Sequence, residues 1–194
     1  MSRDVTTRGI VIGRYAAGEG SVRARLYTEA LGLVSANAKS AREERSKLRA
    51  HVQGGTRGTF SLVKGSYEWR LVGAVGTATT HFELQNPDAR HASASVLHLV
   101  SQLVRGEEAD TFLFDAVWSF LERLPSCDAD EVSAGERLAV FRILFALGYL
   151  PKDDAREILF DPTDYSAAAL AQARAEESFM VRAINEGLAA SGLT

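Results

Sequence analysis

The sequence predicts an α+β protein, with a small β-barrel or meander in residues 1–80 and an all-helical domain in residues 81–194. Short apolar runs of period two, separated by glycine-rich turns, fill the first part. Beyond residue 90 glycine becomes scarce and the apolar spacing changes to three and four. The charge divides at the same place, because residues 1–80 hold 13 of the 22 Lys and Arg but 6 of the 25 Asp and Glu. The first part is therefore basic and the second acidic, which favours two modules with different partners.

Alternation of apolar and polar residues predicts a first strand over residues 6–15 and a second over residues 22–27. In the second strand the apolar side chains face a core, and Arg23 and Arg25 face the opposite side. The turn that follows contains Gly32, which can adopt a positive φ and return the chain as the second half of a hairpin.

Residues 54–79 predict two further strands on either side of a turn at residues 64–66. Phe60 and Leu62 share one face of the first of these strands. No crossover helix of a dozen residues separates any of the five short strands. A small barrel or meander is therefore predicted in preference to a parallel sheet.

Tyr67, Trp69 and Leu71 occupy alternate positions of the last strand and so face one side of it. The two aromatic rings have two possible uses. As stacking platforms for nucleic-acid bases each contributes about 1 to 3 kcal/mol. Core packing is the favoured interpretation, and in that case any binding of nucleic acid is electrostatic only.

Apolar residues spaced by three and four predict helices over residues 96–104 and 112–124. A third helix over residues 136–147 is too apolar to face water on any wide side, and it ends at Gly148. Ser166 is the predicted N-cap of a single final helix.

Signals for catalysis or metal binding are weak. Cys127 is the one cysteine, which excludes an intrachain disulfide and a zinc site built from several thiols. His91 and His98 are two helical turns apart, about 10.5 Å, which is too far for two ligands of one ion. Gly18, Glu19 and Gly20 lack the spacing of a phosphate-binding loop. We expect no enzyme activity, no metal and no cofactor.

The sequence also lacks the features of membrane and secreted proteins. No window approaches the roughly 18 consecutive apolar residues of a membrane span. The N-terminus MSRDVTTRG has no apolar core of signal-peptide length, so a cytoplasmic location without membrane contact is expected.

Residues 38–51 concentrate positive charge in a chain whose net charge is −3. Several cations on one surface bind the phosphates of DNA by releasing condensed counterions, without recognising sequence. A loop between barrel strands is suited to this use. The candidate DNA-binding residues in this stretch are Lys39, Arg42, Arg45, Lys47 and Arg49. Where they lie on the polar face of the barrel, Arg14, Arg23, Arg25, Arg57 and Arg70 extend this set.

This stretch also has a purely structural interpretation. Its cations are close to helical spacing, and Glu43 with Lys47 forms an i,i+4 pair, as in a short solvated helix. Charge that only keeps the surface soluble is a further alternative.

An ordered series of short motifs resembles the N-terminal domain of the RecO family of recombination mediators. The motifs are GIVI at 9–12, GE at 18–19, LYT at 26–28, GLV at 32–34 and SKLR at 46–49. The helical part agrees through FRILFALGYLP at 141–151. The chain departs from many family members in lacking the four cysteines of a zinc module after that helix.

The resemblance implies an OB-fold barrel followed by a helical domain. It implies binding of single- and double-stranded DNA, strand annealing, assistance in recombinase loading, and work with RecR and single-strand-binding protein. The acidic C-terminal tail of the latter protein needs a cation beside an apolar slot, for which Arg137 and Arg142 are the candidates. The alternative function is a protein-interaction adaptor that binds no nucleic acid.

Overall fold

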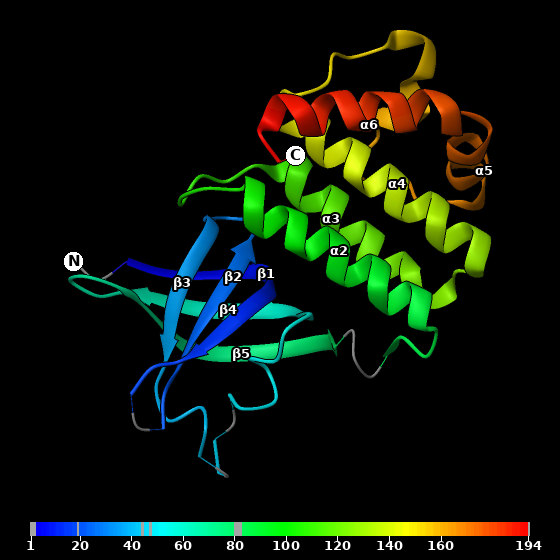
Figure 1. Ribbon diagram of the computed structural model, residues 1–194. Coiled ribbons are helices and arrows are strands. Elements are labelled where there is room, and N and C mark those ends of the chain that lie inside the picture. The colour runs from blue at the N-terminus through cyan, green and yellow to red at the C-terminus, as the bar shows by residue number, and fades with distance from the viewer. Residues whose placement is uncertain (1–2, 19, 44, 47, 80–82, 194) are drawn as a thin grey trace. The chain divides into compact units, whose positions relative to one another are not determined.

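Two compact units make up the chain (Figure 1). The computed structural model describes residues 3–18, 20–43, 45–46, 48–79 and 83–193. The first unit comprises Met1–Glu83 and Val104–Thr111, and the second comprises Leu84–Leu103 and Phe112–Thr194. The boundary predicted between residues 80 and 81 lies outside the described residues. A stretch of the predicted helical domain, Val104–Thr111, folds with the first unit.

The first unit is a closed five-stranded barrel with the strand order β1-β2-β3-β5-β4. Neighbouring strands are antiparallel except β3 and β5, which run parallel. β4 pairs back to β1 along eight residues, and this pairing closes the barrel. The strands are β1 Arg3–Ala16, β2 Val22–Thr28, β3 Gly32–Ala38, β4 Thr56–Lys64 and β5 Trp69–Thr79.

The alternation predicted for β2 is confirmed, because Val22, Ala24 and Leu26 all belong to the apolar core of the barrel. Phe60 and Leu62 on β4 join the same core, as their shared face predicts. An inward side chain at every second position is what a half-exposed strand requires. The outward positions are left for polar side chains.

Gly32 adopts the positive φ predicted for the hairpin, 65°. A second constraint acts at the same residue. A Cβ atom at this position would lie 2.1 Å from the backbone oxygen of Glu108, much closer than van der Waals contact allows. Both the turn and this close approach of backbone therefore require glycine.

The two aromatic residues predicted to share a strand face have different positions. Trp69 begins β5 and is 2% exposed within the barrel core, which confirms core packing for this ring. Tyr67 precedes the strand and is 99% exposed, so the prediction of core packing is wrong for Tyr67. The turn after β4 extends through Glu68, whose backbone oxygen accepts a hydrogen bond from the Gly65 N–H at 2.9 Å. Strand alternation therefore starts only after Tyr67.

The second unit is helical, and α4 is its central element, in contact with α2, α5 and α6. Two 3-10 segments, Leu124–Ser126 and Asp154–Phe160, lie between the helices. The α-helices are α2 Pro87–Leu103, α3 Thr111–Arg123, α4 Ala129–Ala146, α5 Ala167–Ala175 and α6 Glu177–Ser191.

Local capping sets most of these helix ends. Gly148 has φ 78° just after α4, and the Ser166 hydroxyl accepts a hydrogen bond from Ala169 N–H, so both predicted ends are confirmed. The prediction of a single final helix is wrong, because α5 stops at Glu176 and α6 begins after it. The Glu176 carboxylate accepts a hydrogen bond from Arg156 Nε at 3.2 Å, a contact across 20 residues that local spacing does not reveal.

No helix within the described residues is long and apolar enough to cross a membrane.

Candidate nucleic-acid interface

A row of polar side chains crosses four strands of the barrel. Arg23 on β2 lies opposite Tyr15 on β1 and opposite Asn37 on β3. Asn37 in turn lies opposite Arg70 on β5. Residues directly opposite each other share one face of a sheet, so these four side chains form one outward row, the cross-strand row. Tyr15, Arg23 and Arg70 are exposed, and Asn37 is half-buried.

Arg25, two residues along β2 from Arg23, begins a second outward row with Ser35 of β3 opposite it. Arg25 is half-buried, whereas Ser35 is exposed. The β2 and β3 faces of small barrels of this type, together with the loops beside them, commonly bind oligonucleotides. The arginines predicted on the polar face of β2 therefore lie where such a site is expected.

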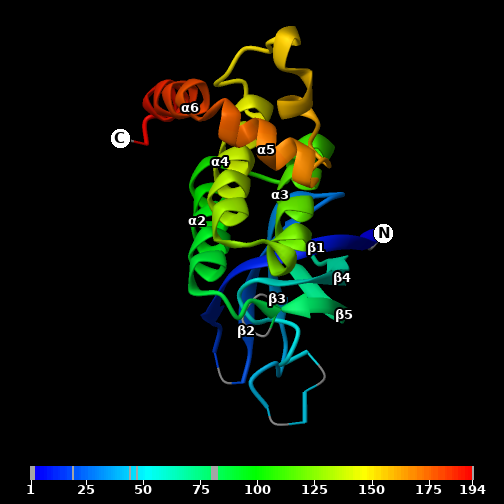
Figure 2. The same ribbon diagram turned by 90° about the vertical axis from the view of Figure 1, so that its right-hand side faces the viewer.

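The basic loop, residues 39–55, joins β3 to β4 and passes the ends of the strands (Figure 2). Its described residues form successive turns with backbone hydrogen bonds from residue i+3 to residue i, among them Ser46 N–H to Glu43 O at 3.1 Å and Arg49 N–H to Ser46 O at 3.2 Å. The described residues contain no helix here, so the short solvated helix is not the structure of this stretch. Lys47, a candidate cation, lies outside the described residues.

Buried side chains attach the basic loop to the barrel. Ala41 and Val52 belong to the barrel core, and Leu48 packs against that core. His51 Nδ1 accepts a hydrogen bond from the N–H of Gly76 on β5 at 3.1 Å. The backbone N–H of Arg42 donates to Gly20 O, beside the β1–β2 turn, at 2.9 Å. The described parts of the loop are therefore held against the barrel by its apolar residues and by these hydrogen bonds.

The cations of the basic loop point away from these attachments. Lys39, Arg42, Arg45 and Arg49 are all exposed. Because the described parts of the loop backbone are held by these contacts, these side chains can bind an anion at a smaller cost of ordering the backbone. The arrangement suits a polyanion that is contacted through its charge.

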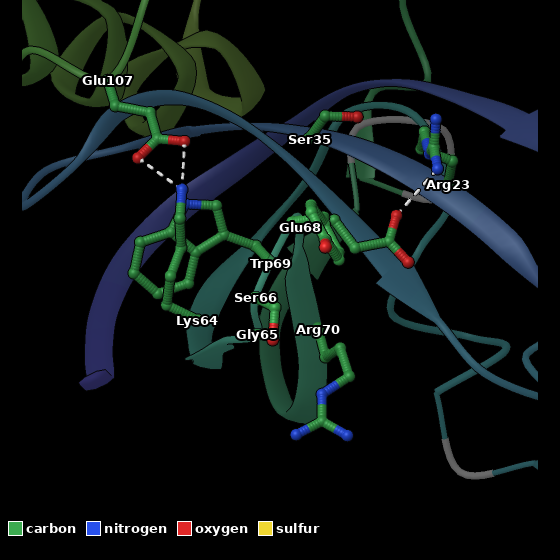
Figure 3. Close-up of a pocket in the computed structure, with 10 residues that line it drawn as sticks. Arg23, Ser35, Lys64, Gly65, Ser66, Glu68, Trp69, Arg70 and Glu107 are labelled. Atoms are coloured by element: carbon green, nitrogen blue, oxygen red, sulfur yellow. Dashed lines mark hydrogen bonds and ion pairs between the residues drawn. The ribbon is translucent and has the colours of Figure 1, made fainter. Parts of the chain in front are cut away.

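A pocket of about 800 Å³ opens beside the cross-strand row, around the β4–β5 turn (Figure 3). Arg23 and Arg70 from the row line it, together with Lys64, Tyr67, Glu68 and Glu107. The pocket combines three cations with an exposed aromatic ring. Phosphates and bases need groups of these two kinds.

Carboxylates already contact two of the pocket's cations (Figure 3). Arg23 donates to Glu68 at 2.7 Å, and Asn37 Nδ2 donates to the other carboxylate oxygen of Glu68 at 3.3 Å. Lys64 Nζ donates to both oxygens of Glu107, at 2.8 and 3.0 Å. These side chains are between 37% and 51% exposed, so water screens both pairs and each is worth at most about 1 kcal/mol.

One barrel candidate lies elsewhere. Arg57 is 5% exposed and forms an ion pair with Glu83 at 3.0 Å. A buried guanidinium that is already paired does not extend a surface track of cations, so its assignment to the DNA-binding surface is wrong. Arg57 lies on β4 opposite Ile10 and Ala78, within the sheet.

The two cations proposed for peptide binding in the helical unit are both engaged in the fold. Arg142 is fully buried, donates to Leu159 O at 3.0 Å and Ile158 O at 3.2 Å, and stacks on the Tyr165 ring. It therefore does not flank an open slot, and this prediction is wrong. Arg137 is paired with Glu177 on α6.

Besides the residues that pair with its cations, the site contains Tyr15, Asn37 and Lys64, which the sequence does not predict as site residues. Tyr15 is 57% exposed and becomes part of the row only through its register with Arg23. The sequence predicts a turn at Lys64, yet this residue ends β4 and lines the pocket. Strand register, which links residues distant in sequence, was the missing signal.

Within the described parts of the chain, no group of three or more His, Cys, Asp or Glu side chains could hold a metal ion. Burial raises the pKa of the Cys127 thiol, the opposite of the shift that prepares a thiolate ligand or nucleophile.

Comparison with known proteins agrees with the motif series. Residues 1–68 match the family model described as Recombination protein O N terminal. Comparison with curated proteins gave no match. The matched region covers β1 to β4 and the basic loop, and the closed five-stranded barrel is the OB fold expected for that domain. The first 68 residues, which form most of the barrel, are therefore similar to the N-terminal domain of recombination protein O, a protein of DNA recombination.

Proposed function

We propose that this protein binds single- and double-stranded DNA through the basic loop and the cross-strand row, anneals complementary strands, and assists recombinase loading without catalysing a reaction. The observation that carries the proposal is the group of exposed cations on a loop that buried residues hold against an OB-fold barrel of a recombination family.

Annealing requires little beyond this arrangement. Two strands repel each other through their phosphates, and exposed cations lower that repulsion by replacing condensed counterions. Contacts to phosphate leave the base edges free to pair, and they carry no sequence information. No bond is made or broken by the protein, so no catalytic group is needed.

RecR and single-strand-binding protein are the proposed protein partners, on the strength of the family resemblance. The helical unit is the place proposed for the acidic tail of single-strand-binding protein. Arg137 is the remaining candidate cation, and a peptide carboxylate would have to displace Glu177 from it. Weak, salt-sensitive binding follows from that competition.

The test compares two charge-reversal variants of equal charge. One carries Arg42→Glu, Arg45→Glu and Arg49→Glu on the basic loop, and the control carries Lys152→Glu, Arg174→Glu and Arg182→Glu on the helical unit, all at exposed positions. Binding of a labelled duplex and of a single strand is measured from low to physiological salt. The loop variant should lose at least tenfold in affinity at low salt, and its salt slope on duplex should fall by about 2 to 3.

The control variant should lose much less affinity, because its cations lie on another unit. Equal losses in the two variants would assign the effect to net charge and remove the basic loop from the site. A wild type that binds no DNA at low salt would favour the protein-interaction adaptor. Annealing of two complementary labelled strands, followed by fluorescence transfer, should slow in the loop variant in parallel with binding.

A further inference from the structure

The acidic segment, Val104–Thr111, connects α2 to α3 in the chain but folds against the barrel. Its attachment is made by backbone. The N–H of Leu33 on β3 donates to Gly106 O at 3.1 Å, and the Gly32 position allows the backbone of Glu108 to approach closely. These contacts hold the segment at the edge of the pocket, which Arg23 and Arg70 of the cross-strand row also line.

From this segment Glu107 reaches Lys64 at the end of β4. Both carboxylate oxygens accept hydrogen bonds from Lys64 Nζ, and Nζ lies 4.8 Å from the centroid of the Trp69 ring (Figure 3). A phosphate with two free oxygens would meet the same ammonium group in the same manner. Glu107 and a DNA phosphate are therefore alternatives for one donor.

We propose that the acidic segment is a built-in competitor of DNA, in which Glu107 occupies the phosphate position on Lys64 and must leave before a strand enters the pocket. This inference rests on the proposed function, and it adds regulation to the same site. It predicts that Glu107 prevents weak anions from binding Lys64. A polyanion that is also bound by the basic loop displaces the Glu107 carboxylate.

The expected size of the competition follows from exposure. The side chains of Lys64 and Glu107 are 37% and 45% exposed, so the pair is screened by water. Pairs of this kind bias an equilibrium by about two- to fivefold, and the bias shrinks as salt rises. The competitor is therefore weak enough for DNA to displace and strong enough to measure.

The test is a double-mutant cycle on DNA affinity. Glu107→Gln removes the competing charge, and Glu108→Gln, at the adjacent exposed residue, makes the same charge change without touching the pair. With a labelled single strand at low salt, Glu107→Gln should bind about two- to fivefold tighter than wild type, and more tightly than Glu108→Gln. The gain should vanish in a Lys64→Gln background.

Each outcome decides between distinct conclusions. Equal gains from Glu107→Gln and Glu108→Gln would show a general charge effect and overturn the proposal. A gain that persists without Lys64 would overturn it as well. If the wild type binds DNA and Glu107→Gln binds it with the same affinity, the competitor role of Glu107 is refuted and the proposed function stands. If the wild type binds no DNA, the proposed function and this inference are both refuted. Melting temperature checks that the variants remain folded.

Discussion

The arginines of the basic loop and four arginines of the helical unit have opposite environments. On the basic loop Arg42, Arg45 and Arg49 are exposed and lie on a backbone ordered by other residues. In the helical unit four arginines join separate segments of the fold. Arg123 forms an ion pair with Glu131, and Arg137 forms one with Glu177. Arg142 donates hydrogen bonds to two backbone carbonyls, and Arg156 pairs with Asp153 and Glu176. An exposed cation can bind a ligand, whereas a cation that is buried or paired within the fold contributes to stability.

The largest expected effect is the difference in stability between substitutions of Arg142 and of Arg42. Arg142→Met leaves Leu159 O and Ile158 O without their donor and removes the cation that stacks on Tyr165, at a cost of about 3 kcal/mol to the helical unit. Arg42→Met on the exposed loop should change stability by less than about 0.5 kcal/mol. Urea unfolding followed by circular dichroism measures both.

This comparison also changes how a charge-reversal experiment at Arg142 is interpreted. Arg142→Glu would place an acid at a fully buried position, so loss of peptide binding there would report misfolding. Arg137→Gln removes the charge at a position that is not fully buried, so it is the more informative variant for the acidic tail. Equal stability of Arg142→Met and Arg42→Met would contradict the structural role of Arg142.

The second prediction is a loss of stability at alkaline pH that originates in the helical unit. Burial raises the pKa of Tyr165 to about 12, while its hydroxyl donates to Ala116 O at 2.9 Å. The unfolded state loses this proton near pH 10, and the folded state keeps it until about pH 12. The contribution is therefore complete below pH 10 and is lost between pH 10 and 12, by about 2 to 3 kcal/mol.

Tyr165→Phe is the control for that titration. It removes the hydrogen bond to Ala116 O and should cost about 1 kcal/mol at neutral pH. Its stability should then decline less steeply than that of wild type between pH 10 and 12. Parallel curves for the two proteins would assign the alkaline loss to other groups.

The third prediction concerns the attachment of the basic loop. His51→Ala leaves the Gly76 N–H without the acceptor that His51 provides and should destabilise the barrel by about 1 kcal/mol. Because the loop is then less well ordered, DNA affinity should fall about threefold although no cation is lost. Oligonucleotide titration measures this effect, and a matched change at the exposed His91 should leave affinity unchanged. Undiminished binding by His51→Ala would show that loop order is unimportant.

The smallest expected effect comes from a barrel ion pair at acid pH. The hydrogen bond from Arg8 lowers the pKa of Glu29. The stability from this pair is present above pH 4.5 and is lost as the pH falls through the lowered pKa. The side chains of Arg8 and Glu29 are 41% and 31% exposed, so the loss is below about 1 kcal/mol. Acid unfolding of Glu29→Gln against wild type measures it, and a loss of several kcal/mol would show a less screened pair.

Much of the fold followed from local patterns. Four such features act within a few residues: the alternation of β2, the glycine of the hairpin, the serine before α5 and the glycine after α4. Because their causes are local, the sequence is enough to predict them. The basic loop was also predictable as a region. Charge density is visible in sequence, whereas the turns that order it are not.

The sequence alone determined that a basic, strand-rich part precedes an acidic helical part, that the motif series of a recombination family begins the chain, and that cations gather between two strands. Tertiary structure decided what each cation does. Arg57 and Arg142 are buried, Glu107 reaches Lys64 from 43 residues away, and Tyr67 falls outside its strand. Exposure and pairing depend on register and on contacts between distant segments, and neither has a local period that a sequence can display.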